Sequence, residues 1–322
     1  MPPKISYIIL FYNQEALAEE AINSALAQEG PPIEVVISDD ASVDQTFAVA
    51  QKCAAAYHGP HKVVLNKNTK NLGVTGNFQK AFTLCSGQWI VAAGGDDLSQ
   101  KTRVQRIVDT IKTNPGVMAI SSHYSMVTAA GDPLPVSDEW FSAMVLMQEW
   151  PLEKVLTRAC WGRPMLSLLG AATAWHRDLF EKFPSLSEAP RYVSEDSVLR
   201  WRALLLGYVR LIPDKLVVYR RLAGSLTHFD QGAGLLGREE YKMKMLGRAL
   251  DGYVYSRSDF LWANKKGFIS SERLANCLSK LDYLISYQKA QLEFPKASVS
   301  RKIGLLLMYF RAGLWRRLLG KS

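Results

Sequence analysis

The stretch Trp89–Gln100 reads WIVAAGGDDLSQ, an apolar run followed by two glycines and two adjacent carboxylates, Asp96 and Asp97. The apolar run is typical of a buried strand. Two neighbouring carboxylates repel each other, and this cost falls when a cation lies beside them. The stretch therefore predicts a buried strand that ends at a cation-dependent site.

Strand-like and helix-like patterns alternate along the first 120 residues. The expected strands are Ile5–Leu10, Glu34–Ser38, Lys62–Leu65, Trp89–Ala92 and Val117–Ser121. The expected helices are Glu15–Gln28, Val43–Tyr57, Val74–Cys85 and Lys101–Asn114. This alternation with short loops predicts an α/β fold, namely a doubly wound, mainly parallel sheet flanked by helices.

Polar segments follow three of the expected strands. FYN follows the first strand, SDDAS the second and GGDD the fourth. In open α/β sheets, ligands bind outside the carboxyl ends of the strands. The three segments are therefore expected to converge on one edge of one sheet.

The later part of the chain has a less regular pattern up to about Pro190. A helix at Glu195–Leu206 and a strand at Leu216–Tyr219 are expected next. Beyond about Gly232 the sequence is typical of helices, with a break near Phe294–Lys296. We expect a domain over residues 1–230, made of halves 1–120 and 121–230, and a helical C-terminal extension over residues 231–322.

Length and charge restrict the class of protein. The chain has 322 residues, enough for a full core, and a formal net charge of +9, which favours an acidic partner such as nucleic acid, anionic lipid or a phosphorylated small molecule. Its four cysteines have the spacing of neither a metal site nor a disulfide framework. The apolar run near the N-terminus is too short for a signal peptide, and no stretch approaches the ~18 to 20 apolar residues of a membrane span. These features favour a cytoplasmic location.

The Asp96–Asp97 pair has two interpretations. Mg²⁺ or Mn²⁺ takes one or two carboxylates together with the phosphate oxygens of a substrate, and the preceding glycines let the backbone approach a ligand closely. Alternatively, one aspartate caps a helix that starts near Lys101. The position at a strand end, beside SDDAS, favours the metal. Within SDDAS, Asp40 is a candidate acceptor for the imide N–H of uracil or thymine, whereas Asp44 is expected to cap a helix.

Four segments together resemble a known family. SYIILFYNQE, VISDDASVDQT, NKNTKNLGVTGNFQKAFTLCSGQWI and GGDDL resemble, in this order and spacing, the nucleotide-binding half of family 2 glycosyltransferases with the GT-A fold. The resemblance covers about residues 4 to 225. It implies a nucleotide-sugar donor whose base and ribose lie against Tyr12, Asp40 and the Asn71–Gly73 turn. Mn²⁺ or Mg²⁺ on Asp97 would hold the diphosphate, with Asp96 near the ribose or just behind the direct ligands of the metal.

The segment YVSEDSVLRWRALLLG, residues 192–207, resembles the family element whose aspartate deprotonates the acceptor hydroxyl. That role falls on Asp196, with Glu195 beside it in the substrate site. A carboxylate within hydrogen-bond reach can take the proton of a sugar hydroxyl as the new bond forms. One base opposite the leaving diphosphate implies a single displacement with inversion. The alternative is a helix start, with Ser194 as N-cap and acidic residues favoured by the helix dipole.

VVYRRLAGSLTH resembles the closing loop of the family, so Arg220 and Arg221 are expected to neutralise the departing diphosphate. Leu222 stands where a histidine is frequent, which leaves two interpretations of His228, a substitute metal ligand or a surface or packing residue. GAATAWHRDLF resembles the strand under the donor sugar, although tight packing explains it equally well. The tryptophans between residues 140 and 175 fit the core better than an acceptor site.

Residues 298–322 contain no acidic residue and mix basic with apolar side chains. Such a segment fits a peripheral membrane contact, which would suit a lipid-linked acceptor, or a helix docked on its own domain or a second subunit. Because this stretch supplies much of the positive charge, lipid is favoured over nucleic acid.

Three other functions are alternatives for a chain with this pattern. A sugar nucleotidyltransferase and a dinucleotide oxidoreductase both require a glycine-rich loop after a strand, and FYNQEA offers none. A non-catalytic scaffold with this fold is the third. The sequence predicts an inverting transferase that moves a sugar from a UDP- or dTDP-linked donor to a saccharide acceptor in bacterial surface polysaccharide or lipopolysaccharide synthesis.

Overall fold

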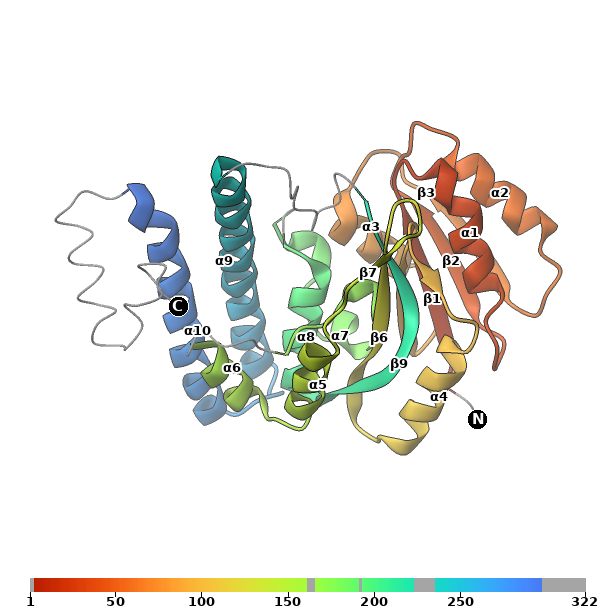
Figure 1. The fold of residues 1–322 in the computed structure, drawn as a ribbon. Helices are drawn as coiled ribbons and strands as arrows, with labels where there is room; N and C mark the ends of the chain where they lie inside the picture. Colours follow the sequence, from red (N-terminus) through yellow and green to blue (C-terminus); the bar gives the residue numbers. More distant parts are fainter. Residues whose placement is uncertain (1–2, 161–165, 191–192, 223–234, 297–322) are drawn as a thin grey trace. The chain divides into compact units, whose positions relative to one another are not determined.

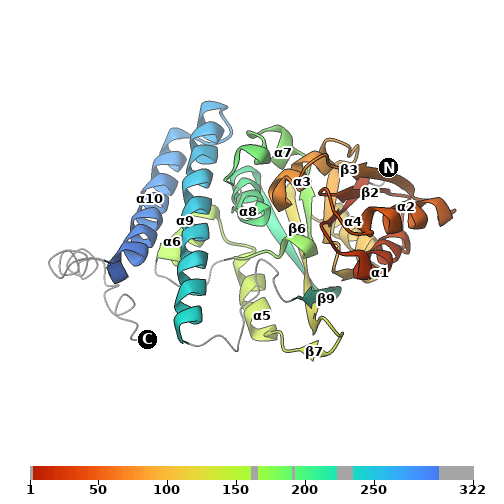
Figure 2. The same ribbon diagram turned by 90° about the horizontal axis from the view of Figure 1, so that it is seen from above.

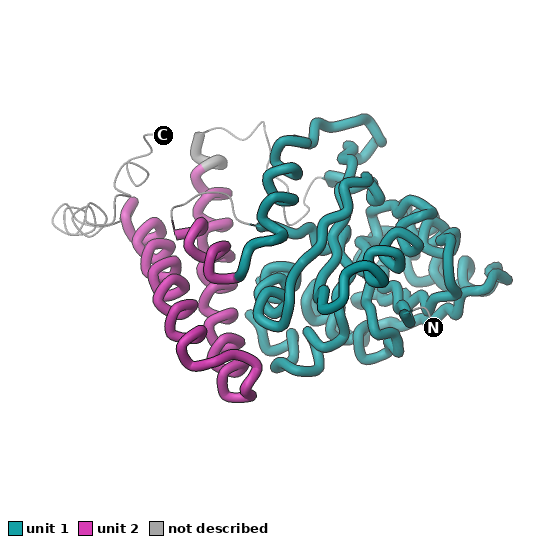
Figure 3. Tube along the Cα trace, turned by 90° about the horizontal axis from the view of Figure 1, so that it is seen from below, with its two compact units in different colours: residues 1–151, 166–228 teal, residues 152–165, 229–322 magenta. Residues whose placement is uncertain are grey.

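The computed structural model describes residues 3–160, 166–190, 193–222 and 235–296. The chain divides into two compact units, shown in different colours in Figure 3. Unit 1 comprises Met1–Pro151 and Leu166–His228, and unit 2 comprises Leu152–Met165 and Phe229–Ser322. The short segment Leu152–Met165 thus belongs to the second unit although it interrupts the sequence of the first.

Unit 1 is built on a nine-stranded sheet of order β3-β2-β1-β4-β8-β6-β9-β5, with β7 paired to β6 (Figure 1). The strands are β1 Ile5–Phe11, β2 Glu34–Asp39, β3 Lys62–Lys67, β4 Trp89–Gly94, β5 Leu98–Ser99, β6 Val117–Thr128, β7 Pro133–Leu134, β8 Thr173–His176 and β9 Tyr208–Arg221. β1 to β4 pair in parallel, β8 is antiparallel to β4 and β6, and β6 is parallel to β9. The predicted α/β fold with a mainly parallel sheet is confirmed.

Helices cover both faces of this sheet (Figure 2). They are α1 Glu15–Leu26, α2 Thr46–Ala56, α3 Gly73–Phe82, α4 Arg103–Thr113, α5 Asp138–Met147, α7 Asp178–Glu181 and α8 Glu195–Leu206. Alternate residues of β1, such as Tyr7 and Ile9, share a core with buried residues of α1, α2 and α4. The other face meets α3 and α8. Because both faces are covered, every residue of β2 is buried, and its central residues Val35, Val36 and Ile37 form a continuous apolar run.

Two strands are longer than the sequence pattern predicts. Their full extents are Val117–Thr128 and Tyr208–Arg221, and they pair along most of their lengths. Pro213 and Asp214 interrupt the apolar pattern of β9, and they fall at a register shift where Ile212 pairs with Ser122 and Lys215 with His123. A bulge accommodates a proline inside a strand because the ladder is locally open there.

The amino ends of the central strands carry a buried carboxylate, Glu34, which is 5% exposed. Its oxygens accept hydrogen bonds from Ser6 Oγ at 2.7 Å, the Ser86 N–H at 2.7 Å and Lys62 Nζ at 3.0 Å. Burial alone would raise the pKa of Glu34, but these donors outweigh it and lower the pKa to about 2. The charge of the Glu34 carboxylate is therefore compensated by hydrogen-bond donors and by Lys62 within the fold.

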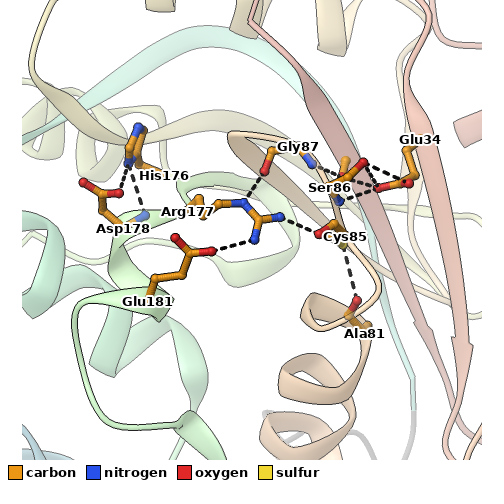
Figure 4. Close-up of polar contacts among 10 residues, drawn as sticks. Glu34, Ala81, Cys85, Ser86, Gly87, His176, Arg177, Asp178 and Glu181 are labelled. Carbon is orange, nitrogen blue, oxygen red and sulfur yellow. Dashed lines mark hydrogen bonds and ion pairs between the residues drawn. The ribbon is translucent and has the colours of Figure 1, made fainter.

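Arg177, directly after β8, closes the same edge (Figure 4). Its guanidinium donates to the carbonyl of Gly87 at 2.7 Å, to the carbonyl of Cys85 and to Glu181 Oε1 at 2.9 Å. The turn before β4 is thereby tied to the segment after β8. All these contacts serve the fold.

Unit 2 is helical, as expected for the C-terminal region. It contains α6 Leu152–Cys160, α9 Leu235–Lys265, α10 Ser271–Glu293 and a 3₁₀ turn at Phe294–Lys296. Arg273 Nε pairs with Glu153 Oε1 at 2.7 Å between α10 and α6, and Arg257 Nε pairs with Asp282 Oδ1 at 2.6 Å between α9 and α10. Within the described part of the chain, no helix has the length and apolar character that crossing a bilayer requires. The predicted membrane segment 298–322 lies outside the described residues.

Candidate active site

The polar segments predicted to converge do lie on one edge of the sheet. The Asp40 N–H donates to the Phe11 carbonyl at 2.9 Å, and the Gly95 N–H donates to the Leu10 carbonyl at 2.9 Å. The carboxyl ends of β1, β2 and β4 are therefore side by side. Tyr12, which follows β1, is 48% exposed at this edge.

The second half of unit 1 reaches the same edge through β8. Because β8 is antiparallel to β4, its amino end lies at the carboxyl end of β4. The 3₁₀ turn Gly170–Ala172 just before β8 contacts β4, and the Gly170 N–H donates to Asp196 Oδ2 at 3.2 Å. The edge that carries Asp97 thus also carries Asp196, although 98 residues of sequence lie between the two aspartates.

The GGDD turn buries Asp97, which is 4% exposed. Its Oδ1 accepts a hydrogen bond from the Arg220 N–H at 2.9 Å. Burial and the charge of Asp96 raise the pKa of Asp97 well above that of a free aspartate, and burial also raises the pKa of Asp96. Helix α4 begins at Arg103 with Thr102 as its N-cap, so the alternative that either aspartate caps it is wrong.

The two glycines make this turn possible. A Cβ atom on Gly94 would lie 2.8 Å from Asp96 Oδ1 and 2.9 Å from Asp97 Oδ2, and a Cβ on Gly95 would lie 2.2 Å from the Phe11 ring. Oxygens of both carboxylates therefore converge on the backbone of Gly94. Side chains other than hydrogen would push them apart.

This donor set fits Mn²⁺ or Mg²⁺, which accept carboxylate oxygens and complete their coordination with substrate phosphates and water. Among the described residues, no group of three or more His, Cys, Asp or Glu side chains could hold a metal ion. Asp96 and Asp97 would accordingly hold a cation together with the oxygens of a ligand. His228, the other candidate metal ligand, lies outside the described residues.

Arg220 braces the turn. Its guanidinium donates to the Asp96 carbonyl at 3.0 Å and to Glu20 Oε2 at 3.0 Å, and the residue is 7% exposed. The predicted diphosphate contact would require this buried side chain to exchange one of these partners. Arg221 is more accessible, at the end of β9.

Asp40 is 3% exposed and caps the turn that precedes α3. It accepts hydrogen bonds from the Leu72 N–H at 2.8 Å, the Gly73 N–H at 2.8 Å and Asn68 Nδ2 at 2.9 Å. Gly73 has φ +76°, a conformation that favours glycine. The predicted base-binding residues Asp40, Asn71 and Gly73 are thus brought together, with Asp40 already committed to holding the turn.

A buried amide network that the sequence pattern did not predict lies behind Asp40. Asn68 Nδ2 also donates to Asn77 Oδ1 at 3.0 Å, and Asn77 Nδ2 donates to the Ser38 carbonyl at 3.1 Å. The available signal was the repeated asparagine in NKNTKNLGVTGN. Asp44 lies one residue before the N-cap of α2, which is Gln45, and its Oδ1 accepts from the Thr46 N–H at 3.0 Å, so it satisfies the first N–H of the helix from outside the N-cap position.

Glu195 and Asp196 begin α8. Ser194 occupies the N-cap position, but its hydroxyl donates to Asp196 Oδ1 at 2.5 Å and makes no capping bond to the helix backbone. Burial raises the pKa of Glu195, and the charge of Asp196 raises it further. A Cβ on Gly170 would lie 2.7 Å from Glu195 Oε1, so the glycine makes room for this carboxylate.

Comparison with known proteins agrees with this geometry. The model of glycosyl transferase family 2 matches residues 6–183, more than half of the chain. The chain belongs to glycosyl transferase family 2. It is therefore a glycosyltransferase.

Two bacterial proteins are similar in sequence to this glycosyltransferase. An uncharacterized glycosyltransferase of Nostoc sp. is 25% identical over 258 residues, which cover 80% of this chain and 76% of the relative. ExoO, a succinoglycan biosynthesis protein of Rhizobium meliloti, is 34% identical over 107 residues, 33% of this chain and 29% of ExoO. The chain thus matches less than a third of the length of ExoO.

Two solved structures share the fold. Residues 1–349 of TarS from S. aureus, in complex with UDP, align with TM-score 0.57 and 18% identity over 94% of this chain and 78% of that one. The mannosyltransferase PcManGT from Pyrobaculum calidifontis, in complex with GDP-Man and Mn²⁺, aligns with TM-score 0.59 and 17% identity over 99% of this chain and 83% of that one. The GT-A fold of the glycosyltransferase follows from this likeness.

The tryptophans between residues 140 and 175 differ in burial. Trp175 in β8 is fully buried, as expected for a core residue. Trp140 and Trp150 are partly exposed on and after α5, and Trp161 lies outside the described residues.

Proposed function

We propose that the enzyme is an inverting glycosyltransferase that moves a sugar from a UDP- or dTDP-linked donor to a saccharide hydroxyl. The observation that carries the proposal is the gathering of two separate carboxylate pairs at one edge of the sheet. Asp96 and Asp97 follow β4, and Glu195 and Asp196 begin α8. A displacement of this kind is served by a cation site on the side of the leaving diphosphate and a base on the side of the acceptor.

Asp97 and Asp96 are assigned to the divalent cation of the donor. When bound, Mn²⁺ or Mg²⁺ would neutralise charge on the diphosphate as it leaves. The cost of burying two adjacent carboxylates supports this assignment, because a cation removes it. Arg220 holds the turn through Asp97 and the Asp96 carbonyl, so we assign charge neutralisation at the diphosphate to Arg221.

Asp196 is assigned as the general base. Its carboxylate accepts hydrogen bonds from the Gly170 N–H and from Ser194, which fix its orientation. It would take the proton of the acceptor hydroxyl as the oxygen attacks the anomeric carbon, while the bond to the diphosphate breaks. The raised pKa of the neighbouring Glu195 marks this pair as a perturbed carboxylate site, and such sites are common where proton transfer takes place.

The donor base is assigned to the side formed by Tyr12, Asp40 and the Asn71–Gly73 turn. Exposed Tyr12 offers a ring face for stacking, and UDP is bound by TarS, which shares the fold. PcManGT binds GDP-Man, so the fold by itself leaves the choice of base open. A saccharide acceptor in bacterial surface polysaccharide synthesis is supported by the similarity to ExoO.

The proposal is tested by thermal unfolding with UDP, dTDP, GDP and ADP, each with Mn²⁺, Mg²⁺ or EDTA. A ligand at about 100 times its Kd adds about 2.7 kcal/mol to the free energy of unfolding, which is readily measured. We expect a metal-dependent rise in Tm with UDP or dTDP. Equal melting curves with every nucleotide and metal would contradict the donor assignment.

A further inference from the structure

A buried hydroxyl connects the nucleotide side of the proposed site, at the start of α3, with the segment before α8 that carries the proposed base. Thr75 Oγ1 donates to the Val193 carbonyl at 2.8 Å, across 118 residues of sequence. Thr75 is 5% exposed and Val193 is 2% exposed, so the bond is shielded from water. Threonine in a helix often bonds to a carbonyl of its own preceding turn, and here the hydroxyl bonds to a distant segment instead.

Each residue of this hydrogen bond lies within three residues of a position that belongs to the proposed site. Thr75 lies in the first turn of α3, whose start is fixed by the bonds from the Leu72 and Gly73 N–H groups to Asp40. Val193 lies three residues before Asp196, whose Oδ1 is held by Ser194. The first turn of α3 and the hydrogen bond from Thr75 to Val193 therefore connect the turn held by Asp40 to the segment that carries Asp196.

We propose that Thr75 is a positioning residue that sets Asp196 against the donor by tying the first turn of α3 to the start of α8. This inference rests on the proposed function, since it assumes that Asp196 is the base. The hydroxyl is the necessary group, because a buried carbonyl that loses its donor shifts toward another partner or water. A displacement of about 1 Å at a reacting group can lower a rate by about 100-fold.

The test compares Thr75→Val with Thr75→Ser. Release of nucleoside diphosphate is measured from a panel of UDP- and dTDP-hexoses, with water or simple saccharides as acceptor, well below the Tm of each variant. We expect Thr75→Val to lower kcat about 10- to 100-fold and to leave the KM for the donor within about 3-fold. Thr75→Ser keeps the hydroxyl and is expected to retain most of kcat.

Two further variants separate positioning from general destabilisation. Thr83→Val removes a hydroxyl bond to the Lys80 carbonyl at the other end of α3, and it is expected to leave kcat unchanged. Thr75→Val in an Asp196→Asn background is expected to cause little further loss, because both changes act on the same group. If Thr75→Val does not fold, Thr75→Ala removes the same hydroxyl and is expected to show the same loss.

The outcomes distinguish the two proposals. Three outcomes overturn the role of Thr75 alone. They are full kcat in a folded Thr75 variant that lacks the hydroxyl, a loss of kcat that Thr75→Ser shows as well, and an equal loss in the Asp196→Asn background. A wild-type enzyme that releases nucleoside diphosphate while Asp196→Asn is fully active refutes the base, and the role of Thr75 with it. A wild type without turnover on any donor refutes the proposed function itself.

Discussion

Buried carboxylates at the two edges of the sheet in unit 1 have pKa values that shift in opposite directions. At the amino ends of the strands, Glu34 accepts hydrogen bonds from two serines and a lysine, and its pKa falls to about 2. At the carboxyl ends, Asp97 has the Arg220 N–H and a second carboxylate beside it, and its pKa rises. The first arrangement stabilises the fold. The second disfavours the charged form of Asp97 unless a cation balances it, an arrangement that is common at functional sites.

The largest effect is expected at the acceptor side of the carboxyl edge. Asp196→Asn should lower sugar transfer by roughly 10²- to 10⁴-fold, because the amide cannot take a proton. The affinity for UDP or dTDP should stay near the wild-type value in a calorimetric titration. Asp178→Asn, in the first turn of α7, is a matched control that should keep full activity. Persistent transfer in Asp196→Asn would place the base elsewhere.

Asp97→Asn tests the other carboxylate of the functional edge. We expect the metal-dependent part of nucleotide binding to be lost, a decrease of roughly 10²-fold in affinity in the presence of Mn²⁺. Because burial already disfavours the charged form of Asp97 in the ligand-free protein, the neutral amide of the same size should let the ligand-free protein unfold no more easily than wild type. Equal nucleotide affinity with Mn²⁺ and with EDTA in the wild type would contradict the metal assignment.

Gly94→Ala examines whether the two aspartates must converge. The new Cβ would crowd Asp96 Oδ1 and Asp97 Oδ2, so metal-dependent nucleotide binding should weaken by about 10-fold or more. Gly247→Ala in α9 meets nothing within 4 Å and should leave binding unchanged while stabilising the helix by up to about 1 kcal/mol. Unaltered metal dependence in Gly94→Ala would show that the cation lies elsewhere.

The smallest effect is expected at the amino edge and concerns stability alone. Glu34→Gln should lower the free energy of unfolding by about 1–3 kcal/mol at pH 7, with nucleotide binding intact. The folded pKa of Glu34 is about 2, below the ordinary value of 4.5, so its contribution is present above about pH 4.5 and is lost as the pH falls toward 2. The difference between wild type and Glu34→Gln should therefore shrink from pH 6 to pH 3 in urea unfolding. A constant difference would show that Glu34 acts through packing rather than charge.

Much of the fold was predictable because its signals are local. Strand and helix periodicities in the first 120 residues gave the element order, and polar segments after three strands gave the edge that carries Asp40 and Asp97. The long pair β6 and β9 was underestimated, since Pro213 reads as a break in sequence and only the bulge opposite Ser122 and His123 accommodates it.

The amino-acid sequence by itself determined which residues stand at the strand ends and at the start of α8, because hydrophobic pattern and turn residues act over a few positions. The tertiary structure alone decided how they are used. It committed Asp40 to the Asn71–Gly73 turn and Arg220 to the Asp96–Asp97 turn, and it joined Thr75 to Val193. These roles depend on distances between side chains far apart in the chain, which are fixed only when the sheet and its helices pack together.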